Sequence, residues 1–119
     1  MIGNHHNLIS YQKAKNLTLE IISLSDKLPK NRTHDILFSQ ILRSASSIGA
    51  NIIEGYGRNN PKEYKQFLGI ARGSCLETEY WLDILQNSSV QNLQNLIGLN
   101  TEIIKIITAT ISNIKTREG

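Results

Sequence analysis

Apolar residues recur along most of the chain with the three- and four-residue spacing that is typical of helices. The apolar residues of the first run are separated by such steps and therefore lie on one side of a helix. This pattern is typical of a helix that packs in a bundle. Pro29 ends the run, because the residue before a proline disfavours the helical conformation. We therefore expect a first helix over about residues 11–28. Its core positions are Ala14, Leu17, Ile21, Leu24 and Leu28.

Two further apolar arcs predict a second helix over about residues 35–56 and a third over about 61–87. Thr33 is a candidate N-cap for the second helix. Asn60, Pro61 and Glu63 suit the N-cap, first and third positions of the next helix, which is a strong start signal. The second arc contains Leu37, Phe38, Ile41, Leu42, Ala45, Ile48, Ile52 and Ile53. The third contains Tyr64, Phe67, Leu68, Ala71, Cys75, Trp81, Leu82 and Leu85.

A fourth helix is expected over about residues 90–115, with Ser88 and Gln91 as its capping box. Its apolar row, interrupted at Asn100, is Leu93, Ile97, Ile104, Ile107, Ile111 and Ile114. A second row beside it, which favours an additional neighbour, is Leu96, Leu99, Ile103 and Ile106. Short connections make sequential helices antiparallel. The predicted fold is therefore all-α, a single up-down-up-down four-helix bundle over residues 1–119.

Polar residues line one side of the second predicted helix at steps of three or four. They are Gln40, Arg43, Ser47, Asn51, Glu54 and Arg58. One interpretation is an ordinary solvated face. The other is a face packed against a partner, because serine and asparagine are weak helix formers and their small size allows close approach. We expect Asn51 and Glu54 to be partly buried, with Arg43 or Arg58 as the charge partner.

The third predicted helix carries a second stripe, formed by Gly69, Gly73, Leu76 and Tyr80. A glycine inside a helix costs about 1 kcal/mol relative to alanine, and it is tolerated best where a neighbour comes close. The two apolar side chains continue the same line. The stripe predicts a contact between copies of the chain, and hence a homo-oligomer.

Composition favours a cytoplasmic protein. The single cysteine, Cys75, excludes an internal disulfide, and neither a membrane-spanning run nor a signal-peptide pattern is present. The net charge is +3, and residues 1–34 hold five bases against two acids. This bias is compatible with nucleic acid as well as with an ordinary solvated surface. The candidate phosphate contacts are Lys13, Lys15, Lys27, Lys30 and Arg32, with Arg72 and Lys105 as secondary candidates.

Catalytic patterns are scarce in this sequence. Glu77 and Glu79 are two positions apart and point in different directions on a helix, and Cys75 lies on a core face. The Glu-x-x-His pairs of di-iron bundles do not occur, and His5 and His6 lie near the terminus. We expect no catalytic residue, no metal, no cofactor and no enzymatic activity. An enzyme with a site between subunits is an alternative.

One long stretch resembles a known family. It runs from Arg43 through the serines to Asn51, Glu54, Gly55 and Arg58, and continues through residues 62–64, 67–74, Glu77, Glu79 and Leu82. These residues are similar to the signature of the bacterial four-helix-bundle proteins first noticed as reading frames inside intervening sequences of large-subunit ribosomal RNA. Residues 11–14 and Leu17 also fit the start of that family. Gly49 departs from it, because the family usually has proline there.

The resemblance implies an antiparallel four-helix bundle, and related proteins assemble as ring-like pentamers with a basic surface. The accessory variability determinant of diversity-generating retroelements is similar in fold, and it binds nucleic acid and its reverse transcriptase. We therefore expect a non-enzymatic homo-oligomer, with a pentamer favoured, that binds RNA or DNA and possibly serves a reverse transcriptase. A structural protein–protein interaction module that binds no nucleic acid is the alternative.

Overall fold

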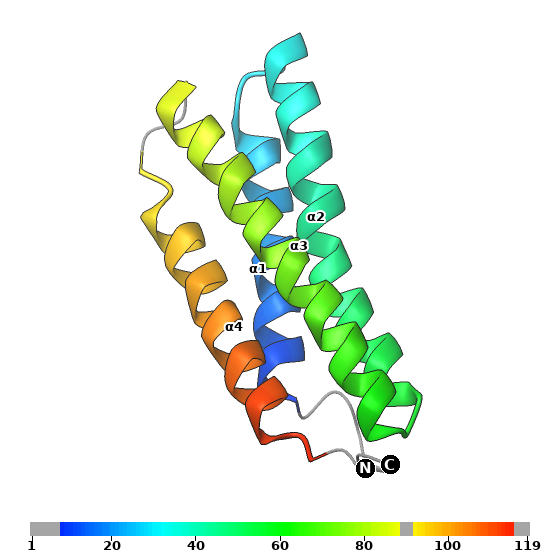
Figure 1. The fold of residues 1–119 in the computed structure, drawn as a ribbon. Coiled ribbons are helices and arrows are strands. Elements are labelled where there is room, and N and C mark those ends of the chain that lie inside the picture. Colours follow the sequence, from blue (N-terminus) through cyan, green and yellow to red (C-terminus); the bar gives the residue numbers. More distant parts are fainter. Residues whose placement is uncertain (1–7, 89–91, 116–119) are drawn as a thin grey trace.

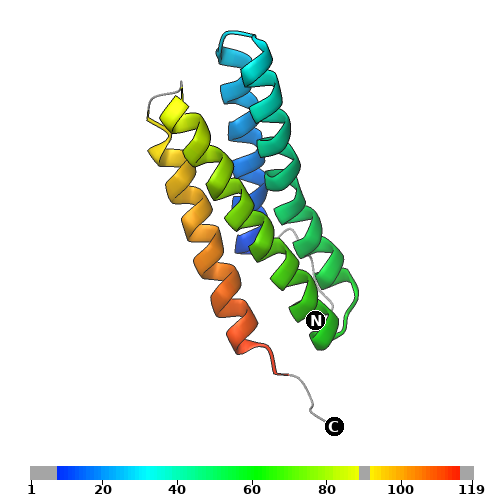
Figure 2. The ribbon, with the colours of Figure 1, turned by 45° about the horizontal axis from the view of Figure 1, so that its top comes forward.

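The computed structural model describes residues 8–88 and 92–115 and forms a bundle of four helices (Figure 1). Helices α1 and α3 run in one direction, and α2 and α4 run in the other. Each helix packs against its neighbours in the order α1–α2–α3–α4, and α4 packs back on α1, so α1 and α3 occupy diagonal corners (Figure 2). The predicted four-helix bundle is confirmed. The helices are α1 (Ile9–Lys27), α2 (Arg32–Gly57), α3 (Pro61–Ser88) and α4 (Gln94–Asn113).

Among the described residues, every regular element is a helix, and none of the helices is long and apolar enough to cross a membrane. Helix α2 continues through Gly49 without a break, so the position where the family usually has proline is helical in this chain.

The start of α2 differs from the predicted start. Asn31, rather than Thr33, is its N-cap: the Asn31 Oδ1 atom accepts the backbone N–H of His34 at 2.9 Å. The ring of His34 is buried and its Nδ1 donates to the carbonyl oxygen of Pro29 at 2.8 Å. These bonds stabilise the connection between Pro29 and the first turn of α2. The helix therefore begins at Arg32, earlier than the apolar pattern indicates.

The other two starts have opposite outcomes. At α3 the predicted cap is confirmed, since Asn60 Oδ1 accepts the N–H of Glu63 at 3.1 Å. At α4 the prediction is wrong. Ser88 is the last residue of α3, where its hydroxyl donates to the carbonyl of Leu85 at 3.2 Å, and α4 begins only after Leu93. Gln91, the other half of the expected capping box, lies outside the described residues.

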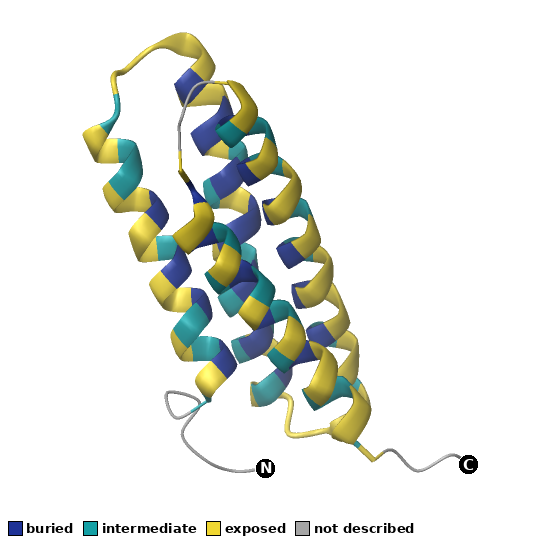
Figure 3. Cartoon of the chain, turned by 90° about the vertical axis from the view of Figure 1, so that its left-hand side faces the viewer, coloured by how far each residue is buried: buried dark blue, intermediate teal, exposed yellow. Residues whose placement is uncertain are grey.

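The core follows the predicted arcs of α1, α2 and α3 closely (Figure 3). Most predicted core positions are buried, whereas Leu24, Leu28, Leu42, Ile53, Phe67 and Trp81 are half-buried at its edge. Two hydroxyl residues that the apolar pattern did not mark, Ser44 and Thr78, are fully enclosed. The α2–α3 interface therefore contains polar groups as well as apolar ones.

Helix α4 buries a different row from the one predicted. Its buried positions are Leu93, Leu96, Asn100, Ile103 and Ile107, whereas Ile97 and Ile104 are half-buried. The buried positions again alternate three- and four-residue steps, with Asn100 at the centre. Leu96 and Ile103, which the sequence assigned to an additional neighbour, are covered by the chain's own bundle.

At Gly55, α2 lies very close to α3. A Cβ atom added there would lie 2.5 Å from the Cβ of Phe67, which is too short for any real contact. By contrast, a Cβ at Gly98 on α4 would meet nothing within 4 Å. The glycine in the family signature is therefore required by packing at this corner of the bundle.

We expect Gly55→Ala to lower the free energy of unfolding by about 1–3 kcal/mol, because the helices must move apart. Gly98→Ala is the matched control and should raise it by about 1 kcal/mol, since alanine is the better helix former. Urea denaturation at one fixed protein concentration compares the two. Equal stabilisation by both substitutions would contradict the close approach at Gly55.

Candidate nucleic-acid interface and subunit contacts

The polar stripe of α2 faces α3 of the same chain. Near the middle of α2, Arg43 forms an ion pair with Glu77 of α3, and Gln40 Oε1 accepts from Arg43 Nε at 3.2 Å. The indole Nε1 of Trp81 donates to the same Glu77 Oε2 at 3.1 Å. The Glu77 carboxylate therefore links α3 to α2.

Small hydroxyl groups continue this seam toward the middle of the bundle. Thr78 Oγ1 donates to Ser44 Oγ at 2.8 Å, and the hydroxyls of Ser47 and Ser74 are 2.8 Å apart. Asn51, which is half-buried as predicted, donates from Nδ2 to the backbone oxygen of Ser47 at 2.8 Å. The serines of α2 therefore allow the close approach of α3, and these contacts serve the architecture of the bundle.

The lower end of the seam corrects one prediction. Glu54 was expected to be partly buried, but its side chain is 55% exposed. Arg58, the C-cap of α2, is its charge partner at 2.8 Å, and the Arg58 guanidinium also lies 5.1 Å from the ring centre of Phe67. Because the pair forms along the surface of one helix, Glu54 needs no buried partner.

We accordingly expect Glu54→Gln to change the free energy of unfolding by less than about 1 kcal/mol, as is usual for an exposed ion pair. Thermal unfolding at low and high salt checks this, because screening should remove even the small difference. A loss of several kcal/mol would show that the carboxylate has a buried role.

Cys75 is buried against α4, as the sequence predicted. Burial raises the pKa of its thiol to about 12, so the thiolate needed for nucleophilic attack is scarce near neutral pH. In the described part of the chain, no three His, Cys, Asp or Glu side chains gather in a group that could hold a metal ion. His5 and His6 lie outside that part.

The five basic residues selected from the first 34 positions are not brought together. Lys13 pairs with Glu102 of α4 at 2.7 Å, and Lys15 is exposed farther along α1. Lys27, Lys30 and Arg32 lie at the opposite end of the bundle, around the α1–α2 connection. Asp26 and Asp35 flank these three residues in the sequence, so the local excess of positive charge there is small.

A different set of cations occupies the first half of α3 and the second half of α4, which are side by side because the two helices pack antiparallel. Lys62, Lys65 and Arg72 share one side of α3 by their spacing. Asn100 Nδ2 donates to the backbone oxygen of Cys75 at 2.9 Å, which fixes the relative heights of the two antiparallel helices. Five residues beyond Asn100, Lys105 therefore lies near the height of Arg72. Lys115 follows the C-cap of α4, at the same end of the bundle as the start of α3.

We call Lys62, Lys65, Arg72, Lys105 and Lys115 the basic patch. All five are exposed, and none of them takes part in an ion pair among the described residues. Two acidic residues close in sequence to Lys62 and Lys105, Glu63 and Glu102, pair with Arg58 at the end of α2 and with Lys13 of α1. From Lys62 to Arg72 the patch extends over two to three helical turns, about 15 Å along α3.

The same side of α3 changes character beyond Gly73. Leu76, Glu79, Tyr80 and Asp83 line a hollow with Ile97 of α4, and we call these five residues the α3 patch. Its two large side chains are half exposed, Leu76 at 50% and Tyr80 at 57%. At Gly69 and Gly73 an added Cβ would meet nothing within 4 Å, so the predicted contact stripe is open in the single chain. Its role between subunits stays a prediction.

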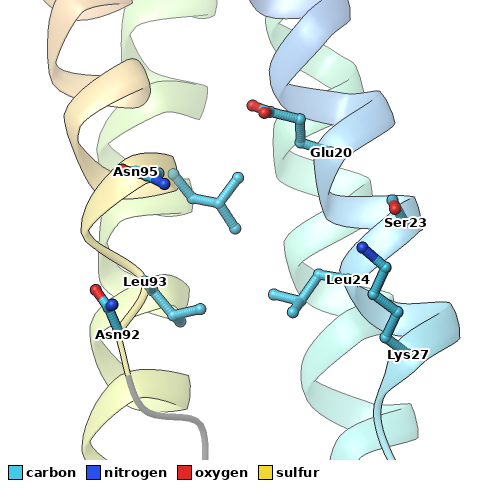
Figure 4. A pocket seen from close by; sticks show the side chains of 8 residues that line it. Glu20, Ser23, Leu24, Lys27, Asn92, Leu93 and Asn95 are labelled. Carbon is cyan, nitrogen blue, oxygen red and sulfur yellow. The ribbon is translucent and has the colours of Figure 1, made fainter.

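A second hollow lies between α1 and the start of α4 (Figure 4). Glu20, Ser23 and Lys27 of α1 face Asn92 and Asn95 across it, with Leu24 and Leu93 at its base. One lysine and one glutamate share this space, so its charge selects neither anions nor cations.

Comparison with known proteins agrees with this architecture. The sequence pattern of one family, described as the 23S rRNA-intervening sequence protein, matches residues 6–111. Among solved structures, a protein of unknown function from the S23 ribosomal protein family of Bacteroides thetaiotaomicron superposes with a TM-score of 0.80. It is 29% identical, and the alignment covers 88% of this chain and 100% of the other. No curated protein matches. Because the family pattern spans nearly the whole bundle, the chain belongs to the 23S rRNA-intervening sequence protein family.

Proposed function

We propose that this protein is a non-enzymatic, homo-oligomeric RNA-binding protein that contacts the phosphate backbone through the basic patch. The observation that supports this most is the patch itself, in which five exposed cations form no ion pair with any described residue. Lysine and arginine side chains that no internal carboxylate neutralises are the usual partners of phosphate groups.

The chemistry of the patch favours contact with the backbone over recognition of bases. Lysine, which supplies four of the five cations, acts as a point charge without the planar geometry that reads base edges. The described part of the patch presents no aromatic side chain on which a base could stack. Binding should therefore depend on RNA length and salt more than on sequence. The family's description links its members to ribosomal RNA, which favours RNA over DNA as the ligand.

Self-association would strengthen such a surface. One patch of five charges binds weakly at physiological salt, but copies of the patch on one assembly bind the same RNA molecule together and gain avidity. The resemblance to ring-like relatives favours a pentamer. An accessory role beside a reverse transcriptase follows from the same resemblance, and we retain it as a proposal for the partner.

A protein–protein interaction module is the second candidate. The half-exposed Leu76 and Tyr80 favour it, since apolar groups on a helix surface suit a protein contact. The two functions use different halves of α3, so the protein can combine them.

The test is RNA binding measured over a salt series. With all five cations on phosphates, the slope of log affinity against log salt should approach about −3.5, which is 0.7 per contact on a single strand. Nitrocellulose filter binding with an unstructured single-stranded RNA gives this slope directly. An affinity that is absent at low salt would contradict the proposal and favour the interaction module.

A further inference from the structure

The cations of the basic patch form two rows on neighbouring helices. The α3 row consists of Lys62, Lys65 and Arg72, and the α4 row consists of Lys105 and Lys115. The α3 row is about 15 Å long, and the α4 row has a similar length. Because α3 and α4 are antiparallel, Lys105 lies near the height of Arg72, and Lys115 lies at the end of the bundle where α3 starts. The two rows therefore cover the same part of the bundle.

The α3 row lies on the side of α3 that is next to α4. By their helical spacing, Lys65 and Arg72 share the side of α3 that Leu76 occupies. Leu76 lines a hollow together with Ile97 of α4, so this side of α3 borders α4. A ligand that contacts Lys65 and Arg72 is therefore also close to α4.

The α4 row lies on the outer surface of α4. Ile97 faces the hollow shared with α3, whereas Glu102 pairs with Lys13 of α1. Around the helix, Lys105 lies between these two directions, about 80° from Ile97 and about 60° from Glu102. It therefore points outward from the bundle, and one ligand lying over α3 and α4 can contact both rows.

Acidic residues limit this surface toward the other end of α3. Glu79 and Asp83 lie beyond Gly73 on the same side of α3, and neither takes part in an ion pair among the described residues. Their carboxylates repel phosphate groups. A strand that followed the α3 row from Lys62 would meet them about two turns after Arg72. We therefore expect the RNA to lie across both helices rather than along α3 alone.

A single RNA strand gains little from such a surface. Proteins that bind single strands usually stack the bases on aromatic side chains. The two aromatic residues in the first half of α3 are unsuited to stacking, because Tyr64 is 7% exposed and the ring of Phe67 is covered by Arg58. To contact both rows, a single strand would also have to turn back on itself, and this ordering weakens binding.

A duplex already holds two phosphate strands side by side. Double-stranded RNA is recognised mostly through its phosphates and 2′-hydroxyl groups. The axes of packed helices are about 8–10 Å apart, and lysine side chains are long and flexible, so the two rows can reach two strands. We propose that the basic patch binds double-stranded RNA, with the α3 row on one strand and the α4 row on the other. This inference rests on the proposed RNA-binding function and names the form of RNA.

The first experiment compares the two forms of RNA by fluorescence anisotropy. One ligand is an RNA duplex of about 16 base pairs, and the other is an unstructured single strand with the same number of phosphates. We expect the duplex to bind at least about tenfold more tightly near 0.1 M salt. Equal or tighter binding of the single strand would overturn the inference and leave the proposed function intact. If neither RNA binds even at low salt, the proposed function fails and the inference fails with it.

The second experiment tests the two rows, because the high charge density of a duplex attracts any cationic surface. Lys105→Gln combined with Lys115→Gln removes the α4 row, so both RNAs then meet a single row. The preference for the duplex should fall to less than about threefold. Lys27→Gln combined with Lys30→Gln is the matched control, because it removes the same charge at the other end of the bundle, and it should keep the full preference.

The comparison of these two variants separates row geometry from total charge. If loss of the α4 row weakens binding of both RNAs equally and keeps the preference for the duplex, total charge determines the affinity. That result would overturn the contact of one strand with each row. Loss of the preference in the control variant would overturn it as well.

Discussion

Replacing Asn100 by aspartate should destabilise the protein by about 4 kcal/mol at neutral pH and far less in acid. Asn100 is 1% exposed, and its Nδ2 donates to the backbone oxygen of Cys75 at 2.9 Å. Its Oδ1 finds no donor among the described residues. A carboxylate at this position would lose the donor and place a charge in the apolar interior.

The pH dependence follows from the direction of the pKa shift. Burial raises the pKa of a carboxyl group in the folded state, by about 3 units in an apolar site, and each unit corresponds to 1.36 kcal/mol. The protonated acid is tolerated, so the cost is small below the unfolded pKa of about 4. The cost grows as the pH rises above that value.

Urea denaturation at about pH 4 and pH 7, with each value taken relative to the unaltered protein at the same pH, measures this difference. Asn100→Leu is the control. It removes the unpaired oxygen with little change of shape, so its stability should stay within about 1 kcal/mol of the original at both pH values. Equal stability of the Asn100→Asp variant at the two pH values would show that position 100 is accessible to water.

The case of Asn100 shows where reasoning from the sequence stopped short. Leu93, Leu96, Asn100, Ile103 and Ile107 already have regular bundle spacing, but an asparagine in that series was treated as an interruption. The predicted row was therefore centred on Ile97 and Ile104, which lie beside the row that is buried in the structure. Polar residues at core positions are common devices for fixing register in helical assemblies, and allowing for one would have predicted the correct face.

Helix existence, order and direction were predictable, because strong periodicity and hard stops such as Pro29 and Pro61 determine them. The polar stripe of α2 was also found, but spacing on one helix does not say what the stripe faces. Ser44 and Ser47 meet Thr78 and Ser74 through contacts more than 25 residues apart in the sequence. Only the packing of α2 on α3 makes these contacts evident.

The basic patch was found only in part, since Arg72 and Lys105 were secondary candidates and its three other lysines were not selected. Lys62 and Lys65 belong to one helix, and Lys105 and Lys115 lie in another part of the chain, so a charge count along the sequence leaves each pair unremarkable. If the charges had been summed separately over each half of each helix, the first half of α3 and the second half of α4 would both have been basic. Because these halves are adjacent in an antiparallel pair, their lysines would have been grouped with Arg72. The count over residues 1–34 instead selected cations that the fold separates.

Reversing charge in the basic patch should have the largest effect on function. Lys62, Lys65 and Lys105 are exposed, so their replacement by glutamate should leave helicity unchanged. Three lost phosphate contacts should reduce the magnitude of the salt slope by about 2 and weaken RNA binding at least about 100-fold near 0.1 M salt. The effect should be similar for RNAs of different sequence, because these contacts carry no base information.

The most direct test compares this triple variant with a matched one, in which Lys27, Lys30 and Arg32 at the other end of the bundle become glutamate. Both variants change the net charge equally, so only the position of the charges differs. We predict that filter binding at about 0.1 M salt shows the large loss for the Lys62, Lys65 and Lys105 variant and a several-fold loss at most for the other. Equal losses, or a larger loss for the Lys27, Lys30 and Arg32 variant, would contradict the assignment of RNA binding to the face formed by α3 and α4.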